Sequence, residues 1–433
     1  MGTLIFSMVV VAEIAFAVFC IITKSNQQKL RNISRIAAFS IFVVFTILPI
    51  IDWSSRYYAL AALLLLLAII RVIALIHKKE EKKAYKLARV VLKAIGMTVL
   101  IFTLTLPVII FPQHKAMEVT GEYKVATITH TYTDTKRVET YTDTGENRKL
   151  NVQLWYPENA DKRYPLIVFS HGGFGTKSSN RSLYNELASQ GYVVCSIDHT
   201  YQCFYTKGED GRTIRMDMGY MQDVSDENAL ADRHKSYEYY QKWMKIRTGD
   251  IDFVIDNILS EAENNNADTA YKLVDTSKIG VMGHSLGGSA ALGIGRMRND
   301  VSAVIALESP FMCDIVGVKD GEFVFKDDIY PVPVLNVYSD SSWSNLSQWP
   351  QYEENYVLLS GSNATAFNVY MSGVGHFNLT DLALTSPLLT RIFNGKKSTT
   401  GTEYCLKTTN KICLEFFDSY LKGKGEFTAD GMY

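Results

Sequence analysis

The sequence predicts an α/β fold, a mostly parallel central sheet with helices on both faces, preceded by a region of four transmembrane helices. Three observations predict this organisation. Four long apolar runs occupy the first 112 residues. Apolar strand patterns then alternate with helix patterns, which is typical of an α/β sheet. One of these strands runs into a serine flanked by glycines and then into a small-residue helix, which indicates a sharp strand-to-helix turn.

Length and composition indicate a folded protein with more than one domain. The chain has 433 residues, more than one ordinary domain needs, and its 47% hydrophobic content excludes a disordered chain. Its 44 basic and 45 acidic residues give a net charge of -1, so we expect no nucleic-acid partner. The six cysteines include no C-x-x-C and no Cys/His cluster at zinc spacing, so no metal site is expected. Cys195/Cys203 and Cys405/Cys413 are close enough in sequence to be bridged, but spacing alone does not show a disulfide.

The apolar runs cover residues 3–23, 36–51, 58–77 and 90–111. Each is near the length that a helix needs to cross about 30 Å of hydrocarbon, and the second is the shortest. The first run lacks the basic region of a signal peptide, and further apolar runs follow it directly. We therefore expect residues 1–112 to be a multi-pass transmembrane region.

Loop charge predicts the orientation of these helices. Basic residues gather after the first and third runs, whereas the loop after the second run carries only Asp52 and Arg56. By the positive-inside rule the two basic loops are cytoplasmic, so everything after residue 112 lies on the extracytoplasmic side of the cell membrane. The basic residues are Lys24, Lys29, Arg31 and Arg35 in one loop and Lys78, Lys79, Lys82, Lys83, Lys86 and Arg89 in the other.

Two ionisable side chains interrupt the apolar runs, Glu13 in the first and Arg71 in the third. Such residues are costly in lipid unless they are paired or reach the headgroups. The expected topology gives them comparable depth, so an intramembrane Glu13–Arg71 pair is one interpretation. In the alternative, Arg71 extends to the cytoplasmic headgroups.

The chain after the membrane region is taken in order. Residues 125–133 and 150–155 alternate as antiparallel strands of a sheet edge. Residues 166–170 form a buried strand that ends in the glycine loop 171–175, whose N–H groups suit an anion. A helix over 182–190 and a strand over 192–197 follow. We expect the later strands at 279–282, 301–307, 333–338 and 367–371 and the helices at about 242–259 and 410–422.

A segment of about 200–245 is rich in tyrosine and methionine and has no clear period. A long insertion at the carboxyl edge of a sheet is usually functional. Its apolar aromatic residues favour a lid or a membrane-facing cap, and a merely structural excursion is the alternative.

The organising motif is Gly283-His284-Ser285-Leu286-Gly287. Glycines on both sides of Ser285 let the strand and helix backbones pass closely, which pushes the serine hydroxyl out of the turn. The dipole of the following helix favours negative charge at this point. This is the nucleophile elbow of an α/β-hydrolase fold.

A serine of ordinary pKa needs a general base and a carboxylate that orients the base. In this fold the order along the chain is serine, acid, histidine. Of the eight histidines only His376 follows Ser285. Glu308 and Asp340 each come directly after a buried strand, and both strand ends line the same edge of the sheet, so both are candidate acids.

Residues 150–422 resemble the platelet-activating factor acetylhydrolase family of α/β-hydrolases, and they are also similar to dienelactone-hydrolase-like and bacterial polyester-hydrolase-like sequences. The resemblance implies Ser285 as nucleophile, His376 as base and Glu308 as acid. Glu308 replaces an aspartate of the family, and the extra methylene keeps Asp340 as the alternative acid. The family's oxyanion donors carry over to the backbone N–H groups of Gly173 and Leu286. The matching segments are PLIVFSHG (165–172), LASQGY (187–192), GHSLGG (283–288), IALE (305–308) and VGHFN (374–378).

Residues 113–433 are therefore expected to form an α/β-hydrolase catalytic domain with a lid-like insertion at about 200–245. The predicted protein is a membrane-anchored serine hydrolase that cleaves lipid or phospholipid acyl esters through an acyl-enzyme, without cofactor or metal. An acyltransferase or peptidase on the same triad is an alternative. Acyl transfer would prevail over hydrolysis only if the site excluded water. A non-catalytic membrane scaffold on the same fold is another.

Overall fold

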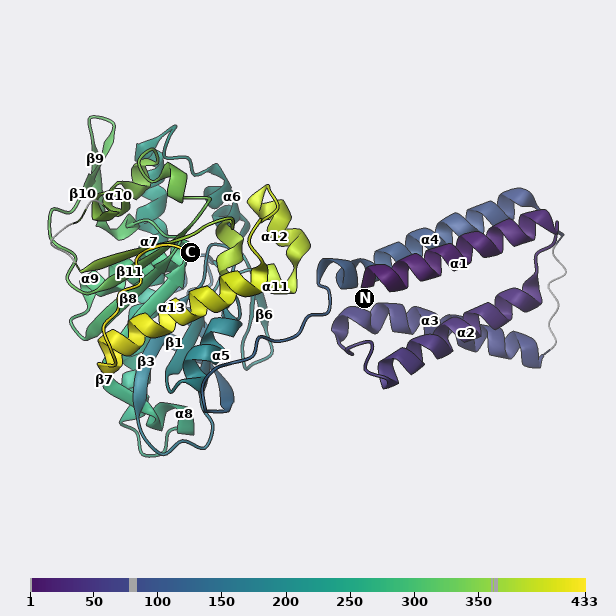
Figure 1. Cartoon of the computed structure of the whole chain (residues 1–433), viewed down its shortest axis with the longest axis horizontal. Coiled ribbons are helices and arrows are strands. Elements are labelled where there is room, and N and C mark those ends of the chain that lie inside the picture. The colour runs from purple at the N-terminus through teal and green to yellow at the C-terminus, as the bar shows by residue number, and fades with distance from the viewer. Residues whose placement is uncertain (1, 78–83, 360, 362–364) are drawn as a thin grey trace. The chain divides into compact units, whose positions relative to one another are not determined.

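The computed structural model describes residues 2–77, 84–359, 361 and 365–433. It divides into two compact units, one of Met1–Lys115 with Leu384–Leu389 and the other of Ala116–Ala383 with Thr390–Tyr433. The first is helical and the second is an α/β domain (Figure 1). Lys78, Lys79, Lys82 and Lys83 of the predicted basic loop lie outside the described residues.

The helical unit consists of α1 (Gly2–Ile22), α2 (Gln28–Ile47), α3 (Tyr58–Ile76) and α4 (Leu87–Ile110). Helix α1 packs on α4, and α2 packs on α3. Gln28–Ile47, Ser55–Ile76 and Leu87–Ile110 are long and apolar enough to cross a membrane, and Phe6–Ile22 is a shorter apolar helix. Three to four apolar helices could therefore span a membrane. Helix α2 begins at Gln28, before the apolar run that was expected from residue 36, so Arg31 and Arg35 lie on the helix and not in a loop.

Glu13 of α1 forms an ion pair with Arg35 of α2, and both side chains are almost buried. The two helices are antiparallel neighbours in sequence, and each residue lies about two turns or more from the connection between them, so they come to similar depth. Arg35, which the sequence placed in a loop, is thus a partner of Glu13. Glu13, Arg35 and Arg71 all line one cavity of about 220 Å³.

The α/β unit is built on a nine-stranded sheet among the described residues, and β2 pairs antiparallel with β1 and β4 while every later pair is parallel. This confirms the expected α/β-hydrolase architecture with an antiparallel edge. In spatial order the strands are β1 (Val125–Val138), β2 (Asn147–Pro157), β4 (Val193–Asp198), β3 (Tyr164–Ser170), β7 (Val274–His284), β8 (Val301–Leu307), β11 (Val334–Ser339), β12 (Ala366–Met371) and β13 (Gly431–Met432).

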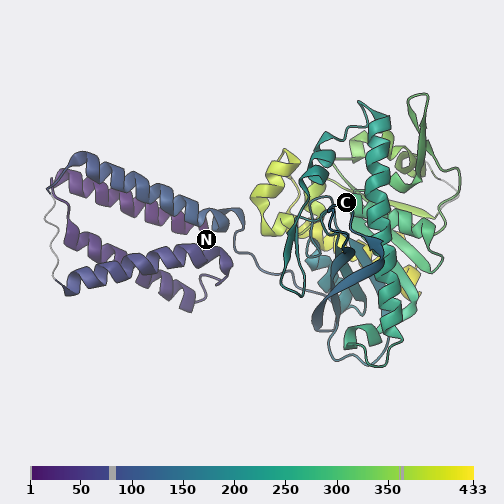
Figure 2. The same ribbon diagram turned by 180° about the vertical axis from the view of Figure 1, so that it is seen from behind.

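Helices cover both faces of the sheet. Helices α5 (Arg181–Ser189) and α13 (Thr402–Lys422) lie in front of it in Figure 1, and the long α7 (Arg233–Ala262) crosses the other face in Figure 2. Helix α9 (Leu286–Met297) packs with α7. The apolar core is correspondingly divided in two, with Trp243 on the α7 side and Phe416 on the α13 side. Every residue of β3 is buried, as expected for a central parallel strand.

The segment 200–245 is more ordered than its composition suggested. It contains a small hairpin of β5 (Tyr205–Lys207) and β6 (Thr213–Arg215), then α6 (Met218–Asp226). Helix α7 begins at Arg233 rather than near 242, because Asp232 caps its N-terminus and accepts a hydrogen bond from the Lys235 N–H. Another hairpin, β9 (Ile315–Lys319) with β10 (Glu322–Phe325), was not predicted.

All six cysteines are free thiols, so neither suggested pair is bridged. Cys405 and Cys413 both lie on α13, which begins at Thr402 rather than near 410. Eight residues along a helix span about 12 Å, well beyond the Cα separation of a disulfide.

Candidate active site

Ser285 lies between β7 and α9 with φ 55° and ψ -129°, a conformation that few non-glycine residues adopt. The flanking glycines make this turn feasible. A Cβ atom at Gly283 would collide with the backbone of Gly287, and one at Gly287 would collide with the carbonyl of Ser170. The local sequence therefore enforces a sharp turn that displays the Ser285 side chain at the carboxyl edge of the sheet.

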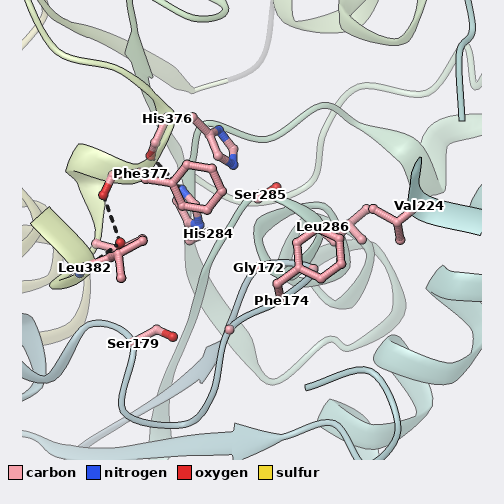
Figure 3. A pocket seen from close by; sticks show the side chains of 13 residues that line it. Gly172, Phe174, Ser179, Val224, His284, Ser285, Leu286, His376, Phe377 and Leu382 are labelled. Atoms are coloured by element: carbon pink, nitrogen blue, oxygen red, sulfur yellow. Dashed lines mark hydrogen bonds between the residues drawn. The ribbon is translucent and has the colours of Figure 1, made fainter. Parts of the chain in front are cut away.

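A cavity of about 210 Å³ opens at Ser285. His376, from the loop after β12, lines the same cavity (Figure 3). Much of the remaining lining is apolar, and it comes from the glycine loop, from α6, from the start of α9 and from the segment after His376. The residues are Phe174, Val224, Leu286, Phe377 and Leu382.

His376 is held by its backbone on both sides. Its N–H donates to the Ser341 hydroxyl at 3.0 Å, and its carbonyl accepts from Nε2 of His284 at 3.1 Å. The rings of His284 and His376 lie with their centroids 4.4 Å apart. Burial lowers the pKa of His376 to about 4, so the imidazole is neutral near pH 7, the form that a general base requires.

Glu308 follows β8 and is almost completely buried. One carboxylate oxygen, Oε2, accepts the N–H of Ser339 at 2.5 Å. The other, Oε1, has no hydrogen-bond partner among the described residues, and a buried carboxylate oxygen without a donor is uncommon. Burial raises the pKa of Glu308 to about 7 against the lowering influence of Ser342 and Ser339. The Ser342 hydroxyl, which also has no hydrogen-bond partner among the described residues, lies near enough to influence this carboxylate, and Oε1 is the oxygen that can still accept from an imidazole.

Asp340 follows β11 and has no unused oxygen. Its Oδ1 accepts from the Tyr370 hydroxyl at 2.8 Å and from the Gly373 N–H at 2.9 Å, and Oδ2 accepts from Nζ of Lys396 at 3.3 Å. Burial alone would raise the pKa of Asp340, but these hydrogen bonds outweigh it and lower the pKa. Asp340 thus ties the end of β12 to the turn that follows.

The structure brings Ser285 and His376 to one cavity, and the two candidate acids directly follow β8 and β11, the strands that lie between β7 and β12 in the sheet. Among the described residues, no hydrogen bond joins the His376 ring to Ser285 or to either carboxylate. Catalytic hydrogen bonds are often long before substrate binds and shorten in the complex.

The glycine loop after β3 lies directly against the elbow. A Cβ atom on Gly172 would lie 3.3 Å from the Cβ of Ser285, and one on Gly173 would lie 3.3 Å from Cδ1 of Leu286. Leu286 is the first residue of α9, so its N–H has no acceptor within the helix. Gly173 and Leu286, the two expected oxyanion donors, therefore lie close together beside the serine.

Sequence reasoning did not find Arg247 of α7 or Tyr220 of α6, which contact the glycine loop. Arg247 donates to the carbonyl of His171 at 2.5 Å, and the Tyr220 hydroxyl donates to the carbonyl of Gly173 at 3.0 Å. The signal that was available is a cation on a buried helix face, since Trp243, Arg247 and Ile251 follow one another at helical spacing and all are buried.

One group of side chains has the donor atoms of a metal site. The donor atoms of His171, Asp198 and Cys203 lie within 4.8 Å of one another, and all three residues are buried. The carboxylate of Asp198, however, already accepts from Nζ of Lys177 at 2.8 Å and from the hydroxyl of Thr206 at 2.7 Å. The lysine ammonium takes the place of a cation, so this group is better described as a structural cluster.

Comparison with known proteins gives a consistent picture. Residues 124–431 match the family described as platelet-activating factor acetylhydrolase, isoform II. The platelet-activating factor acetylhydrolase of Canis lupus familiaris is 23% identical over 288 residues, which are 63% of this chain and 60% of the relative. A probable 1-alkyl-2-acetylglycerophosphocholine esterase of Arthroderma benhamiae is 25% identical over 189 residues, 42% of this chain and 41% of the relative.

The chain thus spans less than two thirds of the length of these curated relatives. Among solved structures, a ferulic acid esterase from Streptomyces cinnamoneus has a TM-score of 0.56 at 22% identity, covering 72% of this chain and 94% of that one. This likeness shows a shared fold.

Proposed function

The chain belongs to the platelet-activating factor acetylhydrolase, isoform II family, and from that premise we propose that it is a membrane-anchored serine hydrolase of lipid or phospholipid acyl esters. The observation that carries the proposal is the cavity that Ser285, on its strained turn, shares with a neutral His376. A displayed serine beside an uncharged imidazole is the arrangement that acyl transfer to serine requires.

In the proposed reaction Ser285 attacks the acyl carbonyl, and His376 takes the serine proton and returns it to the leaving alcohol. Water then hydrolyses the acyl-enzyme by the same route. Glu308 orients the imidazole and stabilises its charged form through Oε1, a buried oxygen without a hydrogen-bond partner among the described residues. The N–H groups of Gly173 and Leu286 bind the oxyanion, and each such donor is typically worth about 100-fold in rate.

The size of the cavity supports a short acyl group. Its volume of about 210 Å³ is below the roughly 300–1,000 Å³ of ordinary ligand pockets, and its apolar lining favours a hydrocarbon over a charged group. The relatives from dog and from Arthroderma benhamiae are named for the removal of an acetyl group. We therefore propose phospholipids with a short acyl chain as the substrate class.

A membrane location suits this substrate. The apolar helices support insertion, and the positive-inside rule supports an extracytoplasmic α/β unit. Segment 200–245 supports the role of a cap, because α6 contributes Val224 to the cavity while Phe204 and Met218 of the same segment are 63% and 67% exposed.

Hydrolysis of defined phospholipids by the full chain in lipid nanodiscs tests this proposal. We expect acetate release from 1-alkyl-2-acetylglycerophosphocholine, at least tenfold slower cleavage of a dipalmitoyl lipid, and no release by Ser285→Ala. Equal rates for wild type and Ser285→Ala would contradict the proposal, and a preference for the long-chain lipid would contradict the proposed substrate class.

A further inference from the structure

Arg247 is a fully buried arginine in the middle of α7. Its Nη1 donates to the carbonyl of His171 at 2.5 Å, and its Nη2 donates to the carbonyl of Gly172 at 3.4 Å. Its Nε donates to Oε1 of Gln202 at 2.8 Å, which fixes the plane of the guanidinium. The guanidinium therefore binds the His171 carbonyl closely and adds a long contact to the Gly172 carbonyl, which also accepts from Nδ1 of His171 at 2.6 Å and from the Gly175 N–H at 3.1 Å.

Tyr220 binds the next carbonyl of the loop. Its hydroxyl donates to the carbonyl of Gly173 at 3.0 Å and accepts from Nη2 of Arg247 at 3.3 Å. Tyr220 is itself buried, and its backbone N–H is bound by the side chain of Asp217, the N-cap of α6. Helices α6 and α7 thus hold the carbonyls of residues 171–173 on one side of the loop.

Peptide geometry determines where the N–H groups then point. In a trans peptide the C=O and the N–H point in opposite directions, and the described chain contains no cis bond. The Gly172 carbonyl is directed by the Gly175 N–H, by the His171 ring and, at longer range, by Arg247, so the N–H of Gly173 points to the opposite side of this peptide plane. The loop lies against Ser285, since a Cβ atom on Gly172 would lie 3.3 Å from the serine Cβ.

The charge on Arg247 is not neutralised by direct contact. Among the ion pairs of the described residues, none involves Arg247, and nearby Asp250 is bound by Arg148 at 2.6 Å and by His199 at 2.9 Å. Burying a cation without a carboxylate partner is costly, so a structural role alone explains it poorly. A buried positive charge beside the loop favours negative charge at the serine, where the oxyanion develops.

We propose that Arg247, acting through Tyr220 and the loop carbonyls, is a positioning residue that aims the Gly173 N–H at the oxyanion and adds a favourable field there. This inference rests on the proposed function. It assigns to α6 and α7 a part in catalysis beyond covering the cavity. Arg247 does not touch the substrate.

The test uses Tyr220→Phe, Arg247→Met and Arg247→Lys in the full chain, with kcat, KM and the inhibition constant of a trifluoromethyl ketone as readouts. This ketone forms an anionic adduct with an active serine, so its affinity reports the oxyanion site. We expect kcat to fall about tenfold in Tyr220→Phe and about 100-fold in Arg247→Met. KM should change less than threefold, and the inhibition constant should rise by the same factor as kcat falls. Arg247→Lys, which keeps the charge, should recover about tenfold over Arg247→Met.

Arg298→Met is the matched control, because Arg298, which follows α9, pairs with Asp252 and Asp256 of α7, and among the described residues it makes no hydrogen bond or ion pair with the glycine loop. It should lower thermal stability and leave kcat per folded molecule unchanged. The inference is overturned if kcat in the Tyr220 and Arg247 variants falls only in proportion to the folded fraction and ketone affinity is unchanged. A wild-type protein without esterase activity would overturn the proposed function itself, and the inference with it.

Discussion

The hydroxyl of Tyr370 donates a hydrogen bond to Oδ1 of Asp340 at 2.8 Å. The same oxygen accepts the N–H of Gly373, and Lys396 contacts the other oxygen. Asp340 therefore fastens β12 to the turn that leads to His376, and both of its oxygens already accept hydrogen bonds. Glu308 Oε1, by contrast, is buried without a partner in the part of the chain that the structure describes.

This contrast predicts which carboxylate acts in catalysis. Glu308→Gln should lower kcat about 1,000-fold or more, because an amide neither orients the imidazole correctly nor stabilises its charge. Asp340→Asn keeps the shape of the turn and should lower kcat less than tenfold. Steady-state kinetics of the two variants with one ester measures both effects. The reverse ranking would assign the role of the acid to Asp340, at the end of β11.

The pH profile follows from two shifted groups. Burial raises the pKa of Glu308 to about 7 and lowers that of His376 to about 4. The base is thus neutral throughout the range in which Glu308 ionises, so the carboxylate limits activity. We expect kcat/KM to fall about tenfold per pH unit below about 7 and to be level above it. Asp340→Asn should keep this profile, and a level profile between pH 5 and pH 8 would contradict the account.

The same shift gives a stability prediction. Because the folded state raises the pKa of Glu308 from 4.5 to about 7, it binds more protons than the unfolded state between these values, and stability falls as the pH rises through this window. Glu308→Gln removes that penalty. Its α/β unit should be more stable than wild type at pH 8, by up to about 3 kcal/mol, and similar at pH 4.5. Thermal unfolding at the two pH values measures this, and destabilisation at pH 8 would contradict it.

Much of the fold is predictable from the sequence because its strands are buried on both faces. Residues 301–307 are apolar except for Ser302, and β8 has those same bounds. The elbow is predictable because only glycine fits at 283 and 287. Helix α7 was placed too late because its first turns carry tyrosines on both faces, with Tyr240 buried and Tyr237 partly exposed, which hides the helical period.

The unpredicted parts of the site depend on contacts between distant segments. Glu308 and Asp340 both follow apolar strands, so the sequence does not distinguish the two candidate acids. Their hydrogen-bond partners in the folded chain do. Arg247 meets His171 and Tyr220 because α7 packs across the sheet and α6 lies beside it. The pairing of Glu13 with Arg35 was missed because a hydropathy reading placed Arg35 outside the helix.

The orientation in the membrane is a separate prediction. With the basic loops in the cytoplasm, the N-terminus and the α/β unit lie outside. A reporter fused after Tyr433 should therefore score as extracytoplasmic, and one inserted in the loop after α3 should score as cytoplasmic. The opposite pair of signals would reverse the proposed topology while leaving the catalytic account intact.

Labelling of membranes that express the chain with a fluorophosphonate probe tests the central claim most directly, since such probes react with an activated serine. The account predicts that the wild-type chain is labelled and that Ser285→Ala and His376→Ala are not, at equal amounts of folded protein. Labelling that persists in Ser285→Ala, or a folded wild-type chain that takes up no probe, would contradict it.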